Sequence, residues 1–405
     1  MKVLGMISGI GSMLIGAKQQ GWDIVGNIEW RPYYHTGTFE YNFPGSFMVK
    51  KVEDLSYEQS ERCKDLDLII GHTECGNYSN LRTKKQAMIH NMADIPDFIN
   101  AVKKFSPKMF AMDNLPKSLI SADWQWYHEQ LPEYDILFEW VSNYNYGNIQ
   151  KHRRRLFVIG AKKELGFHFI PNEKPNHATI QDIIGDLPID YDIPEINHVH
   201  AKIGDKILGW NTYNFGLTKD DPILTLERFQ QAIRSYPSNS LLPYINRKGE
   251  TKLRPGYFKV ALDRHSPVLT GGGSALDNHY RDDTLQPLTQ RERARIQGAP
   301  DSFLFMPVEI TDYKEYSNIY KQIGKFMSVQ FCTYLTQYIM DFLSGPVYSE
   351  DYSCKRLAKP DPFVDKNRME YCVNVGYEHH DKVCQHCWLK NKCPKKVPTL
   401  FSILK

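Results

Sequence analysis

Short apolar runs alternate with helix-like segments over the first part of the chain. The apolar runs have the composition of buried strands and lie at residues 3–7, 24–28, 66–71, 109–112 and 156–160. A helical pattern follows the first run, and another covers residues 95–104. Strands and helices that alternate in this way form a parallel sheet with helices on both faces. The sequence therefore predicts an α/β fold built on a doubly wound, mostly parallel sheet.

The pattern changes twice further along the chain. Between residues 166 and 285, prolines, aromatic residues and polar residues mix without a clear period, which predicts a smaller, irregular domain inserted into the first. Helical patterning returns at residues 290–297 and 320–343, and we expect the helix at 290–297 to pack back against the sheet. The last segment is charged and rich in cysteine. The expected boundaries are 1–165 and 286–343 for the large domain, 166–285 for the inserted domain and 344–405 for the tail.

The composition limits the compartment and the partners. The net charge is only +3, so a site for a polyanion has to be a local basic cleft. The basic runs at residues 82–85 and 151–155 are either parts of such a cleft or simply solvated faces. No apolar stretch reaches membrane-spanning length, and residues 1–5 lead directly into a motif, so we expect a cytoplasmic protein. In that compartment the eight cysteines are thiols or metal ligands rather than disulfides.

A glycine turn follows the first apolar run. Glycines let the backbone turn tightly and approach a ligand closely, although such a turn is also common as a plain strand–helix connection. Glu29 ends the second run, at the spacing where nucleotide-binding folds bind a ribose hydroxyl. Trp30, the next residue, can stack on an adenine. Together these residues favour a nucleoside-cofactor site. The turn consists of Ser8, Gly9, Ile10, Gly11 and Ser12.

A cysteine follows the third apolar run. Cys75 comes just after the run at residues 66–71, which places it at the carboxyl edge of the predicted sheet, where such folds bind ligands. Taken alone, a cysteine in this position is more often a buried structural residue than a nucleophile.

The order of these motifs resembles that of the DNA cytosine C5-methyltransferase family. Residues 288–303 read LTQRERARIQGAPDSF and are similar to the family's L-T-x-R-E-x-A-R-L-Q-G-F-P-D-x-F. Residues 320–325 resemble its last cofactor motif, Y-x-Q-I-G-N. The resemblance covers about residues 1–343. It implies a methyltransferase sheet with a target-recognition domain, S-adenosylmethionine as the cofactor and double-stranded DNA as the substrate.

The resemblance also implies roles for single residues. The family's P-C-Q-x-F-S loop aligns with residues 74–79, which makes Cys75 the nucleophile, and its E-N-V aligns with residues 113–115, which makes Asp113 the acid that stabilises the adduct. Its Q-x-R-x-R resembles residues 150–155, so that Arg153 and Arg155 contact the base or hold the loop. The implied cofactor contacts are Ser8, Gly9, Ile10, Gly11, Ser12, Glu29, Trp30, Asp54 and Lys325.

The mechanism implied by the resemblance is covalent. Cytosine C5 does not attack a methyl sulfonium unaided, but addition of a thiolate to C6 makes C5 nucleophilic. The base has to leave the duplex for Cys75 to reach C6, which implies base flipping.

The sequence departs from the family pattern at the chemistry. The proline before the nucleophile is Glu74, the following glutamine is Gly76, the glutamate of E-N-V is Asp113, and the asparagine of the last motif is Lys325. In one interpretation these changes are tolerated and the product is 5-methylcytosine. In a second, the negative charge of Glu74 raises the pKa of the Cys75 thiol and leaves a catalytically dead DNA-binding protein.

A third interpretation concerns the transferred group. Lys325 should lie beside the positive sulfonium, which is unfavourable unless an anion compensates. Carboxy-S-adenosylmethionine would supply that anion, and the product would then be 5-carboxymethylcytosine. Alternatively, Lys325 pairs with Glu74, with Asp113 or with the carboxylate of the ordinary cofactor.

The tail carries a separate signal. Its cysteines follow the spacing C-x11-C-x2-C-x5-C, which resembles the iron–sulfur loops of some DNA-repair enzymes, with zinc as the rival. A small polar segment needs such a centre to fold, so we expect a structural [4Fe–4S] cluster or zinc ion. The predicted ligands are Cys372, Cys384, Cys387 and Cys393.

The expected setting is a monomer in a bacterial or phage-infected cell. The sequence leaves open whether a cognate restriction enzyme or further modification enzymes accompany it.

Overall fold

The computed structural model describes most of residues 1–345. It does not describe residues 31–35, 77, 79–91, 93, 168, 170, 189–191, 200–201, 204–205, 208–233, 246–250, 270–277, 286, 309–312, 328 and 346–405. The four tail cysteines predicted to bind a metal therefore lie outside the described residues, as does the basic run at 82–85. In the described part of the chain, no helix combines the length and the apolar character needed to cross a bilayer.

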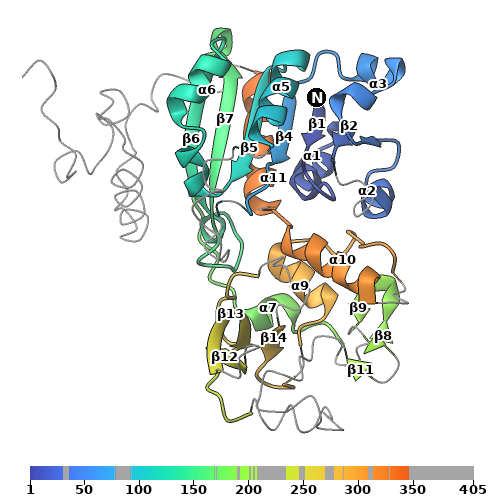
Figure 1. The fold of residues 1–405 in the computed structure, drawn as a ribbon, viewed down its shortest axis with the longest axis vertical. Coiled ribbons are helices and arrows are strands. Elements are labelled where there is room, and N and C mark those ends of the chain that lie inside the picture. The colour runs from blue at the N-terminus through green and yellow to red at the C-terminus, as the bar shows by residue number, and fades with distance from the viewer. Residues whose placement is uncertain are drawn as a thin grey trace, which may run out of the picture.

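One seven-stranded sheet organises the large lobe (Figure 1). Its order is β3-β2-β1-β4-β5-β7-β6, and every neighbouring pair is parallel except those that β7 makes with β5 and β6. The mostly parallel sheet predicted from the sequence is confirmed, while β3 and β6 were not predicted. The strands are β1 (Lys2–Met6), β2 (Asp23–Ile28), β3 (Phe47–Val49), β4 (Leu68–His72), β5 (Met109–Asn114), β6 (Tyr134–Ser142) and β7 (Arg154–Lys162).

Helices cover both faces of this sheet. Successive side chains of a strand point to opposite faces, so a strand buried on both sides is apolar throughout. Ile70 faces the cluster formed with α1 and α11, whereas its neighbour Ile69 faces the cluster formed with α5 and α6. The predicted doubly wound arrangement is therefore present. The helices are α1 (Ile15–Gln19), α2 (Thr36–Asn42), α3 (Tyr57–Arg62), α5 (Ile95–Phe105), α6 (Trp124–Gln130) and α11 (Val329–Ser344).

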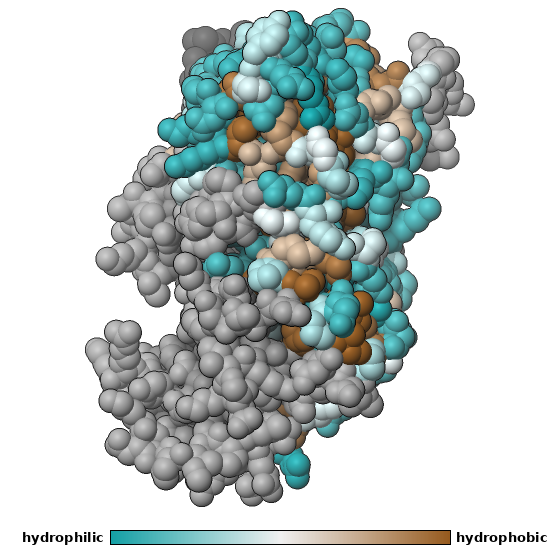
Figure 2. Space-filling model, turned by 90° about the vertical axis from the view of Figure 1, so that its right-hand side faces the viewer, coloured by the Kyte–Doolittle hydropathy of each residue, from teal (hydrophilic) through white to brown (hydrophobic). Residues whose placement is uncertain are grey.

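The surface of the large lobe agrees with this burial. The face shown in Figure 2 is mostly hydrophilic over the large lobe, as expected when helices rather than strands face the solvent.

A smaller lobe lies beside the carboxyl edge of the sheet (Figure 1). Its described residues form a three-stranded sheet in which β13 lies between β12 and β14, together with short strand pairs and helices. Its elements are α7 (Ile180–Ile184), β8 (Asp192–Ile193), β9 (His198–Val199), β10 (Lys202–Ile203), β11 (Lys206–Ile207), β12 (Ser240–Ile245), β13 (Thr251–Val260), β14 (Asn278–Arg281), α9 (Gln290–Gln297) and α10 (Tyr313–Gly324).

Helix α9 begins and ends where local chemistry dictates. Thr289 accepts a hydrogen bond from the backbone N–H of Glu292, whose carboxylate accepts one from the N–H of Thr289, and Gly298 ends the helix at φ 93°. This capping box and glycine stop are readable from the sequence. The expected packing against the large sheet is met in part, because Ala294 of α9 belongs to the apolar cluster on one face of that sheet. Most of the helix packs against α7, α10 and β9, and its Ile296 joins the apolar cluster of the smaller lobe.

The helix expected at residues 320–343 is in fact two helices. Gly324 ends α10 and Val329 begins α11, so Lys325 lies in the break between them. Apolar periodicity continues across this break because Phe326 and Met327 are buried as well, which is why the sequence alone read it as one helix. The break brings Lys325 to the edge of the sheet where the other predicted site residues lie.

Candidate active site

Polar residues from several strands meet at one edge of the large sheet. β1 leads into the glycine turn, and Glu29 directly follows β2. His72 ends β4 three residues before Cys75, and Asp113 lies near the end of β5. Since β1, β2, β4 and β5 run in the same direction, their carboxyl ends share this edge, which is where doubly wound sheets bind ligands.

The glycine turn has a backbone that only glycine adopts easily. Gly9 and Gly11 have φ values of 60° and 84°, in the left-handed region. A Cβ atom at Gly11 would lie 2.6 Å from the ring of Phe43. The N–H of Gly9 donates to Oε2 of Glu29 at 2.9 Å, and the carbonyl of Gly9 accepts from the Asn27 amide. The turn is thus tied to β2, and the acid predicted to bind a ribose already contacts it.

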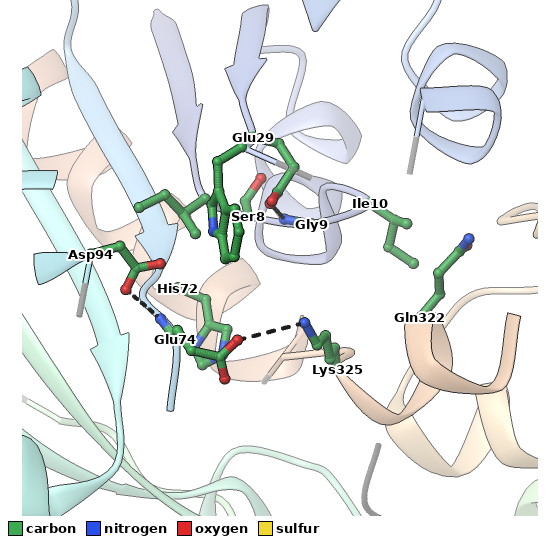
Figure 3. Close-up of a pocket in the computed structure, with 11 residues that line it drawn as sticks. Ser8, Gly9, Ile10, Glu29, His72, Glu74, Asp94, Gln322 and Lys325 are labelled. Atoms are coloured by element: carbon green, nitrogen blue, oxygen red, sulfur yellow. Dashed lines mark hydrogen bonds and ion pairs between the residues drawn. The ribbon is translucent and has the colours of Figure 1, made fainter. Parts of the chain in front are cut away.

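A pocket opens between this turn and the loop after β4 (Figure 3). With its open mouth it encloses about 470 Å³, part of which is open solvent. Carboxylates outnumber ammonium groups on its wall. The lining residues are Ile7, Ser8, Gly9, Ile10, Glu29, Trp30, His72, Glu74, Asp94, Gln322 and Lys325.

Most of the predicted cofactor residues line this pocket, and three do not. The hydroxyl of Ser12 is buried and accepts a hydrogen bond from the N–H of Met327, so it ties the turn to the segment after α10. Gly11 is buried against Phe43. Asp54 is exposed at the end of a short 3-10 helix. The predicted contact of Asp54 with the cofactor stays a prediction.

Lys325 points toward the loop that carries the cysteine. Its Nζ lies 3.9 Å from Oε2 of Glu74, and Figure 3 shows the two side chains facing each other across the pocket. Both side chains are partly exposed, so water screens the pair and its contribution to stability is small. The pair matters because it gives Lys325 an anionic partner within the chain. Pairing with Glu74 was one of the alternatives drawn from the sequence.

Backbone bonds hold the loop in which Glu74 replaces proline. A proline at this position would have no N–H, whereas the N–H of Glu74 donates to Oδ1 of Asp94 at 2.7 Å. The Glu74 carboxylate in turn accepts from the N–H of Gly76 at 2.8 Å, and the N–H of Tyr78 donates to the carbonyl of Cys75 at 3.0 Å. These bonds restrain the loop around Cys75.

Asp113 and Arg155 form a buried ion pair behind the loop. Nε of Arg155 donates to Oδ1 of Asp113 at 2.8 Å and Nη2 donates to Oδ2 at 2.8 Å, so the pairing is bidentate. Burial alone would raise the pKa of Asp113, but Arg155 and a hydrogen bond from His72 hold that pKa below its usual range. Asp113 is therefore ionised at neutral pH.

His72 completes this cluster and reaches the thiol. Burial by itself raises the pKa of Cys75, but the positive charge of His72 and a hydrogen bond to it, with the charge of Arg155, bring that pKa down to about 7. Burial lowers the pKa of His72, but Cys75 and Asp113 raise it to about 9. Glu74 does raise the pKa of the neighbouring thiol, as expected, but it is outweighed. The expected net loss of thiolate is therefore wrong.

Arg153 serves a different purpose from Arg155. Its Nη1 donates to the carbonyl of Leu269 at 2.9 Å and its Nη2 to the carbonyl of Phe326 at 2.8 Å. Gln150 accepts from the N–H of Leu269 at 2.9 Å and donates to the Gln297 side chain. Arg153 thus ties the backbone at Leu269 to that at Phe326, and its predicted contact with the base or the loop stays a prediction. The basic run at 151–155 is in part internal, because both of these arginines are buried.

The sequence missed three polar pocket residues. His72 lies just before the quoted loop motif, and its place at the end of a strand, three residues before a candidate nucleophile, was an available signal. Gln322 lies inside the Y-x-Q-I-G-N match and was likewise available. Asp94 belongs to none of the motifs, and only the folded chain brings it beneath Glu74.

Comparison with known proteins identifies the class. The family model of C-5 cytosine-specific DNA methylases matches residues 1–341, so the chain belongs to this family and is an enzyme of the cytosine-C5 DNA methyltransferase type. The resemblance drawn from the motifs is confirmed, and so is the methyltransferase type of fold.

Individual relatives agree with this class. The chain is 27% identical over 351 residues to the Type II methyltransferase M.XorII of Xanthomonas oryzae pv. oryzae, covering 78% of this chain and 80% of that protein. A solved structure of a prophage-encoded DNA modification methyltransferase (E. coli) superposes with a TM-score of 0.61 at 21% identity, over 85% of this chain and 100% of that one. The Entamoeba histolytica methyltransferase EhMeth gives a TM-score of 0.55 at 14% identity, over 84% and 98%.

Proposed function

We propose that this protein transfers a methyl group from S-adenosylmethionine to C5 of a cytosine in DNA, through a covalent adduct on Cys75. The observation that carries the proposal is that a pocket residue and a reactive thiol are neighbours on one loop. Glu74 lines the pocket at the glycine turn, and the adjacent Cys75 has a thiol pKa of about 7. A methyl donor in the pocket and a thiolate beside it are what the reaction needs.

The residues of the pocket fit S-adenosylmethionine. The buried Glu29 carboxylate supplies acceptors for ribose hydroxyls, and the ring of Trp30, 39% exposed, offers a face for the adenine. The pocket wall carries Glu29, Glu74 and Asp94 against the ammonium of Lys325 and the imidazolium of His72. This negative excess suits a ligand whose sulfonium and ammonium outweigh its single carboxylate. When bound, the cofactor supplies an electrophilic methyl group.

The side chains of the protein then carry out addition and elimination. The Cys75 thiolate adds to C6 of the flipped-out cytosine, forming an S–C6 bond while the electrons of the C5=C6 bond make C5 nucleophilic. Arg155 hydrogen-bonds both Cys75 and Asp113 and so positions the thiolate. After methylation, loss of the C5 proton to a base and departure of the thiolate restore the ring. Direct contact of Asp113 with the base stays a prediction, since both of its oxygens bind Arg155 in this structure.

The charges of the pocket favour methyl over carboxymethyl transfer. The carboxymethyl interpretation rests on Lys325 needing an anion, and Glu74 meets that need from 3.9 Å. A carboxylate on the transferred group would also enter a pocket that already carries three acidic residues.

Nucleoside mass spectrometry tests the proposal. Purified protein is incubated with DNA and either S-adenosylmethionine or carboxy-S-adenosylmethionine, and the DNA is then digested to nucleosides. We expect 5-methylcytosine with the ordinary cofactor and none with Cys75→Ser. Cys63→Ala, which removes a buried thiol elsewhere in the large lobe, is the matched control and should keep the product.

Two results would contradict the proposal. Formation of 5-carboxymethylcytosine that is lost in Lys325→Asn would mean that the transferred group is carboxymethyl and not methyl. No product with either cofactor, together with DNA binding that survives Cys75→Ser, would mean a DNA-binding homologue without activity.

The larger context follows from the family. We assign DNA recognition to the smaller lobe, with the DNA between the lobes and held largely through its phosphates. The name Type II methyltransferase of the relatives suggests a restriction enzyme as a functional companion. We also propose a metal centre in the tail, which rests only on the spacing of its four cysteines. Within the described residues, no group of three or more possible ligands is placed to hold a metal ion.

A further inference from the structure

We propose that His72 takes the proton of Cys75 and holds the resulting thiolate as an ion pair, with Asp113, itself held by Arg155, fixing the imidazole from behind. This role deepens the proposed function and rests on it for its place in the reaction. It makes His72 a catalytic residue, since it contacts the reacting sulfur, and it makes Asp113 a positioning residue.

The geometry places His72 between the thiol of Cys75 and the ion pair of Asp113 with Arg155. Nδ1 of His72 lies 3.0 Å from Oδ2 of Asp113 and 2.9 Å from Nη2 of Arg155. The His72 side chain also hydrogen-bonds the thiol of Cys75. The side chain of His72 is 11% exposed and that of Asp113 is fully buried, so water does little to screen these charges. Cysteine, histidine and carboxylate in this order match the arrangement that activates thiols.

The fold sets this arrangement through strand register. β4 and β5 pair in parallel with His72 directly opposite Asp113, and β7 pairs with β5 so that Arg155 reaches the same carboxylate. Only two residues separate His72 from Cys75, and the hydrogen bonds of Glu74 hold this segment, so Cys75 lies within reach of the imidazole. Three adjacent strands therefore hold His72, Asp113 and Arg155 in place. Rigid elements of this kind keep catalytic geometry better than loops do.

The proton transfer balances in charge as well as in atoms. The S–H bond of Cys75 breaks, its proton goes to the imidazole, and the electron pair stays on sulfur. The cluster then holds two anions, Cys75 and Asp113, and two cations, His72 and Arg155. Without His72 the same thiolate would leave a buried cluster with one uncompensated negative charge, which low-dielectric surroundings strongly disfavour. The proton would then remain on sulfur.

The imidazolium also has a function later in the reaction. When sulfur adds to C6 its negative charge passes to the base, and His72 stays protonated with Asp113 as its counter-charge. When the S–C6 bond breaks, the thiolate forms again beside the same imidazolium. Sulfur therefore leaves as a stabilised anion, which favours the elimination step.

Other charged groups face this cluster and are part of any titration. Glu74 and Lys325 lie at the pocket side, Asp94 lies beneath the loop, and Arg153 lies next to Arg155. Glu74 opposes the thiolate and Arg155 supports it, so the net shift of the thiol is the sum of opposing effects. Because Cys75 and His72 are coupled, measured midpoints belong to the pair.

Alkylation of Cys75 by iodoacetamide between pH 5 and pH 10 tests the role without cofactor or DNA. The Cys75 peptide is followed by mass spectrometry, which separates it from the other cysteines. For the wild type we expect a midpoint near the thiol pKa of about 7. In His72→Gln the midpoint should rise to about 8.5 or above, the ordinary range of a thiol. The rate at pH 7 should fall only several-fold, because a more basic thiolate is more nucleophilic.

A second buried histidine provides the matched control. His198 lies in the smaller lobe, where its nitrogens contact the Pro188 carbonyl and the Thr289 hydroxyl, so His198→Gln should leave the Cys75 midpoint unchanged. A wild-type midpoint near 8.5 to 9 would overturn the proposal without any variant. An unshifted midpoint in His72→Gln would also overturn it and leave Arg155 as the group that holds the thiolate.

The outcomes separate this role from the methyl transfer. A shifted midpoint in a protein that forms no modified cytosine would uphold His72 and reject the proposed function. Formation of 5-methylcytosine by a protein whose Cys75 midpoint does not shift in His72→Gln would uphold the proposed function and reject the role of His72.

Discussion

Replacing Asp94 with asparagine tests the charge arrangement beneath the Cys75 loop. Oδ1 of Asp94 accepts the N–H of Glu74, a bond that an asparagine carbonyl can keep. Among the described residues, Oδ2 has no hydrogen-bond partner although it is buried. Burial raises the pKa of Asp94 to about 6, and the bond from Glu74 only partly opposes this. The ionised carboxylate therefore destabilises the folded state, and asparagine removes this charge.

The size and sign of the effect follow from proton binding. The folded protein holds the Asp94 proton more tightly than the unfolded chain, so this group's stabilising contribution is complete below pH 3.8 and is lost as the pH rises through about 6. A shift from 3.8 to about 6 corresponds to at most about 3 kcal/mol, at about 1.4 kcal/mol per pKa unit. Between pH 5 and pH 8, Asp94→Asn should gain up to about 1.4 kcal/mol over the wild type.

Urea unfolding at pH 5 and pH 8 measures this difference. Asp97→Asn is the control, because Asp97 is an exposed carboxylate on the neighbouring helix α5 and should show no comparable change with pH. A difference between Asp94→Asn and wild type that is equal at the two pH values would refute the reasoning. So would a wild type that is the more stable protein at pH 8.

Three other outcomes are expected. Glu29→Gln keeps an acceptor for the Gly9 N–H but loses the charge-assisted bonds to a ribose, so calorimetry should show about tenfold weaker S-adenosylmethionine binding; an unchanged affinity would place the ribose elsewhere. Arg291→Met leaves the carbonyls of Ile196 and Phe303 without the buried guanidinium that donates to them, so the protein should lose about 3 kcal/mol of stability, and unchanged unfolding would contradict this expectation. The tail should carry iron, seen as a brown colour, or zinc, found by metal analysis. Chelation should unfold the tail and leave cofactor binding intact. A metal-free protein with a folded tail would exclude the metal centre.

Local features of this protein were readable from the sequence. Strands β1, β2, β4, β5 and β7 are predictable because residues buried on both faces of a parallel sheet form continuous apolar runs. The ends of α9 are predictable because its capping box and its terminal glycine lie within the helix's own sequence. β6 was missed because its burial is mixed and polar residues such as Glu139 interrupt the pattern. The nucleophile loop was found because Cys75 and its flanking residues are contiguous.

The chemistry around Cys75 depends on tertiary structure. His72 and Asp113 are 41 positions apart, and Asp113 and Arg155 are 42 apart. Only the register of β4, β5 and β7 brings their side chains together. The sequence shows Glu74 beside Cys75 and so suggests a weakened thiolate, but burial and distance decide which charges act, and the charge of His72 outweighs that of Glu74. The sequence thus determined the family, the sheet and the position of the nucleophile, and only the folded chain decided its ionisation, because long-range electrostatics depends on positions in space.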